Sequence, residues 1–408
     1  MKILQVNKFF YPKGGAEYVF FDTVRVFEKM GHRISFFSMH QENNLASAYE
    51  KYFVSAVDYE KQKFSEKLAS SLKILYSLEA KRKIEKLISD ERPDIAHLNN
   101  IYHQISPSIL HSLKKAKVPT VMTLHDFKLV CASYYMLHKG KACQACKGKK
   151  YYHCFFYGCV KNSRAKSLLN TLEMYLHHYV LRIYDLVDVF IAPSMFLKSK
   201  LETMGFKGKV VYLPNFVELD NFQPEYSWKE RSIVFFGRLA PEKGILTLLE
   251  AMKKNSGITL KIIGEGPIRG PLEEKVRNEK IINVKFLGFK KGIALKEEIA
   301  KSMFVVFPSE CLENNPRVVI EAFALGKPVL GANIGGVPEL VKDNLSGLLF
   351  VPGNAEDLAF RIKYLSDNPQ KIIEMGKNGR RMIEREMNSE KHYQKLLEIY
   401  EKTVSSHN

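Results

Sequence analysis

The stretch that decides the fold is Phe304-Val305-Val306-Phe307-Pro308-Ser309, followed by Glu313-Asn314-Asn315-Pro316 and then by Glu321-Ala322-Phe323. The apolar run predicts a buried strand that ends in a turn. Pro316 suits the first position of a helix, because its missing N–H would have no partner there. Free backbone N–H groups and the positive end of the helix dipole gather at such a start. This arrangement favours an anionic, polyhydroxylated ligand.

The same stretch resembles the retaining glycosyltransferases of family 4, whose C-terminal domains carry two glutamates with seven residues between them. Glu313 and Glu321 have this spacing here. The resemblance implies that Glu321 holds the ribose hydroxyls of a nucleotide and that Glu313 faces the donor sugar. Asn314, Asn315 and Pro316 would line the donor site where many members have Gly-aromatic-Gly, so the identity of the sugar stays open.

Strand-like runs alternate with helical patterns on both sides of this stretch. The predicted strands are residues 3–6, 34–38, 95–98, 120–124, 187–192, 232–237, 260–263, 284–287, 304–307 and 328–331. Such alternation predicts an α/β fold with parallel sheets and helices on both faces. The resemblance implies the GT-B form of this fold, in which two Rossmann-like domains face a central cleft.

A chain of 408 residues is too long for one ordinary core, and two domains of about 200 residues each are expected. We place an acceptor domain at residues 1–212, with a cysteine-rich basic insertion at about 131–166, and a nucleotide-sugar domain at 213–388. The resemblance implies that a helix at 389–408 crosses back to the first domain.

Two cations, Arg238 and Lys243, follow the strand at 232–237. Fixed cations at a strand end stabilise the negative charge that a leaving diphosphate gains as its bond to the sugar breaks. The resemblance implies that both residues bind the donor diphosphate. The chain has no Asp-x-Asp triplet of the kind that metal-dependent enzymes present to nucleotide sugars. We therefore expect catalysis without a cofactor.

Glycines mark three of the predicted strand ends. Gly14 and Gly15 separate the first strand from the first helix, and Gly237 and Gly264 follow later strands. Glycine lets the backbone approach a ligand closely, although a double glycine is also typical of a simple tight turn. By resemblance, these four residues line the donor-binding site.

His125 and Asp126 follow the predicted strand at 120–124. A lone histidine at such a position is more often structural or exposed. The resemblance implies that His125 donates a hydrogen bond to the donor sugar or its phosphate. It also makes Asp126 a candidate to orient that histidine or to act on the acceptor.

Four cysteines cluster in the insertion as Cys143-x2-Cys146-x7-Cys154-x4-Cys159. Paired thiolates of this kind can chelate one tetrahedral ion. A structural zinc is favoured, with His153 or Cys131 as a replacement ligand. Disulfides, redox pairs and unligated thiols stay open as alternatives.

The insertion also carries much of the positive charge. The formal net charge is +18 and the sequence pI is about 9.4, and residues 127–172 contain no Asp or Glu. Lysines interleaved with aromatics suit an anionic membrane surface or a lipid-linked acceptor, but a solvated loop has the same composition. Nucleic acid would also suit these cations, although it is the less favoured partner.

The predicted function is transfer of a sugar from a nucleotide donor, a UDP-sugar by default, to a glycan or lipid-linked acceptor in cell-surface polysaccharide biosynthesis. The alternatives are a nucleotide-sugar epimerase on the same fold and a non-enzymatic nucleic-acid binder. The N-terminus reads as a strand and no run is long and apolar enough to span a membrane. We expect a cytoplasmic protein, with a peripheral position on the inner membrane face as a further option.

Overall fold

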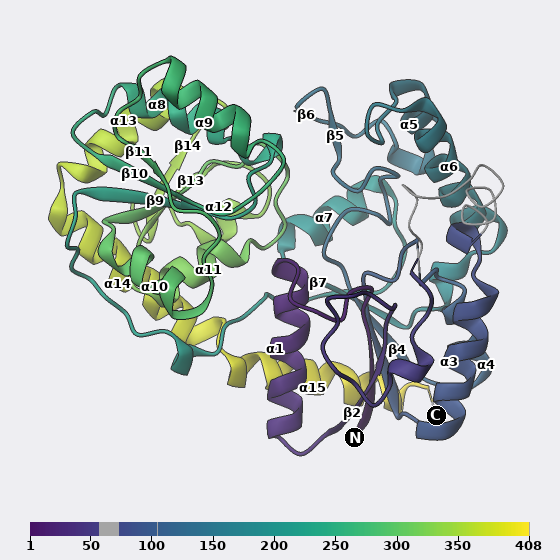
Figure 1. Cartoon of the computed structure of the whole chain (residues 1–408). Coiled ribbons are helices and arrows are strands. Elements are labelled where there is room, and N and C mark those ends of the chain that lie inside the picture. Colours follow the sequence, from purple (N-terminus) through teal and green to yellow (C-terminus); the bar gives the residue numbers. More distant parts are fainter. Residues whose placement is uncertain (57–72, 104, 408) are drawn as a thin grey trace. The chain divides into compact units, whose positions relative to one another are not determined.

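The computed structural model describes residues 1–56, 73–103 and 105–407, which form two α/β units (Figure 1). The first unit comprises Met1–His138, Cys143–Pro214 and His392–Asn408, and the second comprises Lys139–Ala142 and Asn215–Lys391. Residue 408, the last of the predicted C-terminal helix, lies outside the described residues.

The first unit is built on a six-stranded parallel sheet with the order β2-β1-β3-β4-β7-β8. Its strands are β1 (Lys2–Val6), β2 (Arg33–Phe37), β3 (Ile95–Asn99), β4 (Thr120–Thr123), β7 (Val189–Ala192) and β8 (Val210–Tyr212). Its helices are α1 (Gly15–Lys29), α3 (Leu78–Glu91), α4 (Ile109–Lys115), α5 (Tyr152–Tyr157), α6 (Arg164–Tyr175), α7 (Met195–Met204) and, from His392 on, α15 (Ser389–Ser405). Two short strands, β5 (Leu137–His138) and β6 (Lys141–Ala142), pair with each other.

The second unit repeats this plan with the order β11-β10-β9-β12-β13-β14. Its strands are β9 (Ser232–Phe236), β10 (Thr259–Ile263), β11 (Val284–Phe286), β12 (Phe304–Phe307), β13 (Val329–Ala332) and β14 (Gly347–Phe350). Its helices are α8 (Ile245–Lys253), α9 (Arg269–Asn278), α10 (Gly292–Lys301), α11 (Arg317–Ala324), α12 (Val337–Leu340), α13 (Ala355–Ser366) and α14 (Pro369–Glu386).

The α/β fold with parallel sheets is confirmed, and every predicted strand is present with its ends shifted by at most two residues. Four of the described strands were missed: β5 and β6, which have two residues each, and β8 and β14, which lie at a sheet edge and have three and four residues. Runs this short carry little periodic signal. Pro316 is the residue before α11 rather than its first residue, because its backbone is still extended (ψ 116°).

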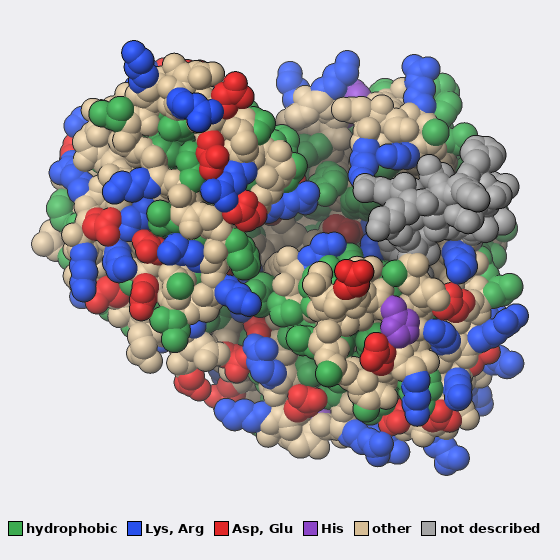
Figure 2. Space-filling view, in the orientation of Figure 1, with side chains coloured by type: hydrophobic (Ala, Val, Ile, Leu, Met, Phe, Trp, Pro, Cys, Tyr) green, Lys and Arg blue, Asp and Glu red, His purple; other side chains and the backbone are tan. Residues whose placement is uncertain are grey.

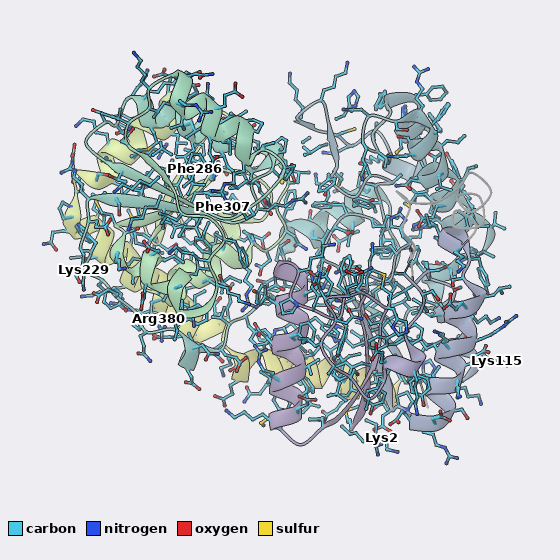
Figure 3. The ribbon with its side chains drawn as sticks, viewed as in Figure 1. Lys2, Lys115, Lys229, Phe286, Phe307 and Arg380 are labelled. Carbon is cyan, nitrogen blue, oxygen red and sulfur yellow. The ribbon has the colours of Figure 1, made fainter. Side chains whose placement is uncertain are left out.

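Each sheet has a core of large apolar side chains. In the second unit, β12 contributes Phe304, which is fully buried, and Phe307, which ends the strand and is labelled in Figure 3. In the first unit, α15 contributes the fully buried Tyr400. The Tyr400 hydroxyl lies 2.6 Å from Nδ1 of His97 on β3, whose Nε2 contacts Thr123 Oγ1 at 2.7 Å. The C-terminal helix is therefore fixed to the first sheet by packing and by a buried polar chain.

Among the described residues, no helix is both long enough and apolar enough to cross a bilayer.

Candidate functional site

The second unit brings four loops together at one edge of its sheet. Strands β10, β9, β12 and β13 are parallel neighbours, so their carboxyl ends meet there, which is where α/β sheets bind ligands. Gly264 lies at the end of β10 with a φ of 144°. A Cβ on this residue would be 1.9 Å from the carbonyl oxygen of Gly237 at the end of β9. This position therefore requires glycine, and the two loops are held in direct backbone contact.

Lys243 is placed by a second close contact of this kind. It ends the short 3₁₀ turn Pro241–Lys243 and precedes Gly244, which has a φ of 66°. A Cβ on Gly244 would be 1.9 Å from the carbonyl oxygen of Pro308, just after β12. The loop that carries Lys243 is thus pressed against the loop that follows β12.

Lys243 and Glu313 form an ion pair at this edge. The Lys243 Nζ donates to Glu313 Oε1 at 2.6 Å, and the same oxygen accepts a hydrogen bond from Ser309 Oγ at 2.6 Å. Both side chains are largely shielded from solvent, with exposed fractions of 26% and 14%. The predicted cation and the predicted sugar-facing carboxylate therefore lie in direct contact.

Their mutual attraction outweighs the cost of burial. Burial alone would raise the pKa of Glu313, yet the charge and hydrogen bond of Lys243 hold that pKa below its ordinary value. Burial would likewise lower the pKa of Lys243, and the Glu313 carboxylate raises it instead. Lys243 is therefore a fixed cation at neutral pH, suited to meeting an anion without taking part in proton transfer.

The other predicted residues of this unit have different surroundings. Arg238 is exposed, and its guanidinium has no ion-pair partner among the described residues. On α11, Glu321 Oε1 accepts a hydrogen bond from Arg317 Nε at 2.6 Å. Asn315 is buried, and its Oδ1 accepts a hydrogen bond from the Asn215 N–H at 3.0 Å. Asn315 thus anchors the start of this unit, a role that sequence reasoning missed.

The adjoining positions complete the predicted donor site. Asn314 lies in the loop before α11, between Glu313 and Asn315, and Pro316 caps the helix. In the loop after β13, the Gly336 N–H donates to the carbonyl oxygen of Glu313 at 2.8 Å. This bond and the bond between Asn315 and Asn215 hold the loop that carries Glu313.

In the first unit, the corresponding sheet edge gathers polar side chains. His125 and Asp126 follow β4, Asn99 ends β3, and Lys8 follows β1. These strands are parallel neighbours. His125 and Asp126 therefore lie at the carboxyl edge of the first sheet, the edge where α/β sheets bind ligands. Sequence reasoning missed Lys8 and Asn99, whose only signal is that each follows or ends a strand.

His125 is neutral in this setting, because burial lowers its pKa to about 4. Its Nε2 lies 2.9 Å from Asn99 Oδ1, an acceptor, so Nε2 carries the ring proton. This tautomer leaves Nδ1 as an acceptor, and the predicted contact of His125 with the donor sugar stays a prediction.

Burial raises the pKa of Asp126 to about 6, although its Oδ1 accepts a hydrogen bond from the Lys128 N–H at 2.8 Å. Burial, with the nearby charge of Lys13, lowers the pKa of Lys8 to about 8. A carboxyl and an amine with pKa values shifted toward neutrality are typical of functional sites.

Gly14 and Gly15 lie at the start of α1, with Gly14 in extended conformation as its N-terminal cap. Glu17 in the first turn of this helix is buried, and burial raises its pKa. Its carboxylate is bonded to Asn7, which follows β1. This loop therefore also belongs to the carboxyl edge of the first sheet.

A buried ion pair stands behind Asp126 that the sequence did not predict. Lys128 Nζ donates to Glu173 Oε2 at 2.7 Å, and the two side chains are 1% and 0% exposed. His103 and His177 each place Nδ1 3.9 Å from a Glu173 oxygen. Lys128 belongs to the basic stretch 127–172, whose cations were expected to face a membrane, a lipid-linked acceptor or solvent, but it is buried.

We expect Lys128→Met to destabilise the protein by about 3–5 kcal/mol, because it leaves Glu173 buried without its cation. The double variant Lys128→Met/Glu173→Leu should recover most of that loss. Urea unfolding measures both. As a control, Arg182→Met breaks a pair whose side chains are 74% and 57% exposed and should cost less than about 1 kcal/mol. An equal loss in the two single variants would contradict the assignment.

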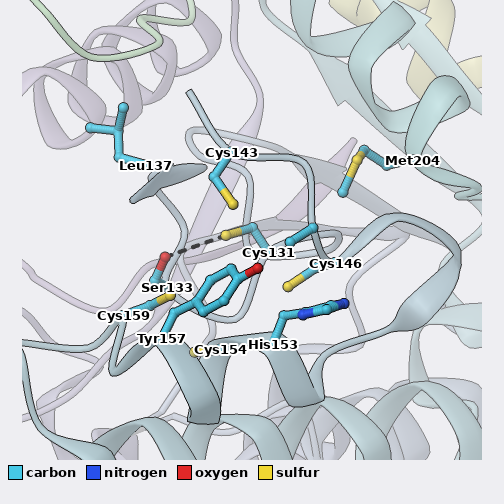
Figure 4. A pocket seen from close by; sticks show the side chains of 11 residues that line it. Cys131, Ser133, Leu137, Cys143, Cys146, His153, Cys154, Tyr157, Cys159 and Met204 are labelled. Carbon is cyan, nitrogen blue, oxygen red and sulfur yellow. Dashed lines mark hydrogen bonds between the residues drawn. The ribbon is translucent and has the colours of Figure 1, made fainter. Parts of the chain in front are cut away.

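Five thiols and one imidazole line a pocket of the first unit (Figure 4): Cys131, Cys143, Cys146, Cys154, Cys159 and His153. The predicted zinc ligands thus lie together, with Cys131 beside them, and all six cysteines of the chain are free. Within residues 1–56, 73–103 and 105–407, however, no three His, Cys, Asp or Glu side chains form a group that could hold a metal ion. The zinc site gains no support from this arrangement and stays a prediction.

Comparison with protein families identifies the chain. The family model described as Glycosyltransferase Family 4 matches residues 13–221, and the model of glycosyl transferases group 1 matches residues 218–382. The protein belongs to glycosyltransferase family 4. The two matches meet within a few residues of the division between the two units.

Curated relatives of this family 4 protein include proteins of archaea, bacteria and a plant. An uncharacterised glycosyltransferase of Methanocaldococcus jannaschii is 28% identical over 47% of this chain and 54% of its own length, so the alignment spans about half of that relative. An uncharacterised 42.6 kDa protein in the cps region of Klebsiella pneumoniae is 26% identical over 83% of this chain and 87% of its own. An amylovoran biosynthesis glycosyltransferase of Erwinia amylovora is 29% identical over 42% of this chain and 44% of its own.

Solved structures share the fold across the whole chain. Sucrose-phosphate synthase from Thermosynechococcus elongatus has a TM-score of 0.74 at 18% identity and covers 100% of both chains. Anabaena HepE, solved in complex with UDP, has a TM-score of 0.69 at 18% identity and covers 98% of this chain and 100% of its own. The family 4 protein therefore has the GT-B glycosyltransferase fold that the sequence predicted.

Proposed function

We propose that this protein transfers a sugar from a nucleotide-sugar donor to a hydroxyl group of a glycan or lipid-linked acceptor, with retention at the anomeric carbon and without a metal. The observation that carries the proposal is the Lys243–Glu313 pair, a desolvated cation held at the carboxyl edge of the second sheet. A cation in this position is preorganised for a diphosphate, whose negative charge grows as the glycosidic bond breaks.

In this reaction, the bond between the anomeric carbon and the diphosphate oxygen breaks, and the acceptor oxygen bonds to the same face of the sugar. The acceptor proton passes to the departing phosphate oxygen. Lys243 and the exposed Arg238 neutralise the diphosphate, and Glu313 faces the sugar. Glu321 exchanges its hydrogen bond with Arg317 for hydrogen bonds with the ribose hydroxyls. The loop glycines Gly237 and Gly264 admit the phosphates close to the backbone. In the first unit, Gly14 and Gly15 face the donor, His125 accepts from a sugar hydroxyl, and Asp126 positions the acceptor.

The choice of donor and pathway rests on the relatives. One relative acts in amylovoran biosynthesis, another is encoded in a cps region, and a protein with the same fold binds UDP. These facts favour a UDP-sugar and a polysaccharide product, and they make UDP-sugars the first donors to test.

A donor screen tests the proposal. Purified protein is incubated with UDP-, GDP- and ADP-sugars, with and without chelator and candidate acceptors, and the released nucleotide is measured. Release from one donor that does not depend on metal supports the proposal. Conversion of the donor to its epimer without release would instead identify an epimerase. No release and no donor-induced thermal shift in folded protein, with lipid extract present, would overturn it.

The insertion and the residues that follow it, up to Val180, offer a surface for an anionic membrane, where a lipid-linked acceptor would reside. Apolar side chains on α5, α6 and the π-helix that follows α6 (Leu176–Val180) are unusually exposed: Phe156 65%, Leu172 52%, Tyr179 54% and Val180 72%. Figure 2 shows lysine and arginine side chains projecting where Figure 1 places β6 and α5. Apolar side chains among cations suit a bilayer with anionic headgroups better than water alone.

Vesicle flotation tests this surface. We expect binding to vesicles that contain about one-third phosphatidylglycerol and weak binding to neutral phosphatidylcholine, since each cation near the surface contributes about 1 kcal/mol. Phe156→Ser/Val180→Ser should reduce binding by at least about tenfold, because it removes apolar burial. Phe360→Ser, which changes a side chain that is 69% exposed in the second unit, is the matched control. Equal binding of both variants would exclude this face.

A further inference from the structure

The thiols of Cys154 and Cys159 are brought together by the way α5 ends. Gly158 has left-handed backbone dihedrals (φ 61°, ψ 34°) just after this helix. The Cys159 N–H then donates to the carbonyl oxygen of Cys154 at 3.1 Å, and the Gly158 N–H donates to that of Phe155 at 3.1 Å. At helix ends with these two hydrogen bonds, the residue after the glycine packs over the residue five positions before it. The motif therefore places one cysteine side chain against the other.

The two thiols line the same pocket, and the Cys159 thiol interacts with the Cys154 sulfur. A disulfide requires Cα atoms within about 4.4–6.8 Å, and the 3.1 Å backbone hydrogen bond holds these two residues close together. Cys131, by comparison, directs its sulfur to Ser133 Oγ at 3.3 Å.

Both cysteines line the pocket shown in Figure 4. Cys154 is 1% exposed and Cys159 is half-buried, so Cys159 is the more accessible of the two.

We propose that Cys154 and Cys159 are a redox-active dithiol that closes to a reversible disulfide when a peroxide oxidises it. One of the two sulfurs attacks an oxygen of hydrogen peroxide, which yields a sulfenic acid and one water. The other sulfur then attacks the sulfenic sulfur, the S–S bond forms, and the sulfenic oxygen leaves with the proton of the second thiol as a second water. Two thiols are oxidised and one peroxide is reduced. A dithiol reductant reverses the change.

Tryptic mapping tests the proposal, because cleavage after lysine separates the thiols. Residues 151–161 carry Cys154 and Cys159, residues 142–147 carry Cys143 and Cys146, and residues 129–139 carry Cys131. Full-length protein is treated with equimolar hydrogen peroxide, alkylated under denaturing conditions and digested. We expect peptide 151–161 to lose both alkyl groups and two hydrogen atoms, with the other two peptides still alkylated. Dithiothreitol before alkylation should restore the doubly alkylated peptide.

Variants and metal content decide between the outcomes. In Cys159→Ser the internal disulfide should disappear, whereas Cys143→Ser should leave oxidation of peptide 151–161 unchanged. Disulfide formation within residues 142–147, or to Cys131, at a lower peroxide dose would overturn the proposal. So would an equivalent of zinc in the purified protein whose removal by chelator is needed before any thiol reacts, because that result would establish the predicted metal site instead.

Discussion

Lys243→Met is expected to lower the rate of sugar transfer by about 10²–10³-fold, the usual cost of removing one preorganised charge that stabilises a transition state. The effect should fall on kcat more than on KM, because the diphosphate gains charge only as the bond breaks. Methionine keeps the length of the side chain, so the backbone contact between Gly244 and Pro308 is unchanged. Steady-state release of nucleotide measures both constants.

Stability must be measured alongside, since Lys243 also neutralises Glu313. The double variant Lys243→Met/Glu313→Gln removes the unpaired carboxylate and should recover folding without recovering transfer.

Arg238→Ala should lower the transfer rate by more than about tenfold and leave the free energy of unfolding unchanged, because this exposed side chain has no ion-pair partner among the described residues. As a control, Lys254→Met breaks an exposed pair with Glu356 and should retain full activity. A loss below tenfold in both Lys243→Met and Arg238→Ala would remove the diphosphate role.

The fold was predictable because its signal is local. Strands such as Phe304–Phe307 are short apolar runs bounded by turn residues. Gly237 and Gly264 directly follow two other strands, β9 and β10. The close approach of these glycines, 1.9 Å from a Cβ on Gly264 to the oxygen of Gly237, explains why such residues stand there. Local patterns thus placed these residues at strand ends, whereas their roles in the candidate site came from the family resemblance and stay predictions.

The partners of site residues were not predictable, because they depend on contacts between distant parts of the chain. Nothing in the pattern around Lys128 separates it from the exposed lysines nearby, yet it is buried against Glu173, 45 residues away. Asn315 similarly reads as a ligand-facing residue until its hydrogen bond to Asn215, 100 residues away, is seen. Which ring nitrogen of His125 carries the proton also depends on Asn99, a residue on another strand. Such pairings are decided by topology, which composition and spacing do not encode.

The first unit should unfold in mild acid while the second unit stays folded. All 12 histidines of the chain lie outside residues 215–391. Four of them are buried: His97, His177, His178 and His392. Burial lowers the pKa of all four, to about 3 for His97 and His178 and to about 4 for His392. As the pH falls through 6.5, the unfolded chain binds protons that the folded chain does not. Each histidine then costs about 2 kcal/mol of stability at pH 5.

Other groups do not cancel this loss. Asp126 acts in the opposite direction, because its raised pKa of about 6 lets the folded state bind a proton first, and it offsets about one histidine. Glu313 in the second unit and Glu173 in the first have lowered pKa values, so their contributions are lost only below about pH 4.5. Between pH 6.5 and 4.5 the net loss therefore falls on the first unit.

The single tryptophan, Trp228, separates the two units experimentally, because it packs against the core of the second unit. Titration from pH 7 to pH 4.5 should reduce the far-ultraviolet circular dichroism while Trp228 fluorescence stays native. The transition should move to lower pH in His392→Gln, which removes one of the buried histidines, and should not move in His40→Gln, whose side chain is 42% exposed. Coincident loss of both signals, or an earlier change in Trp228 fluorescence, would show that acid sensitivity does not reside in the buried histidines. Together, the buried histidines cost a large part of a domain's net stability, which is about 5–15 kcal/mol. The order of the two unfolding transitions therefore tests whether this cost falls on the first unit.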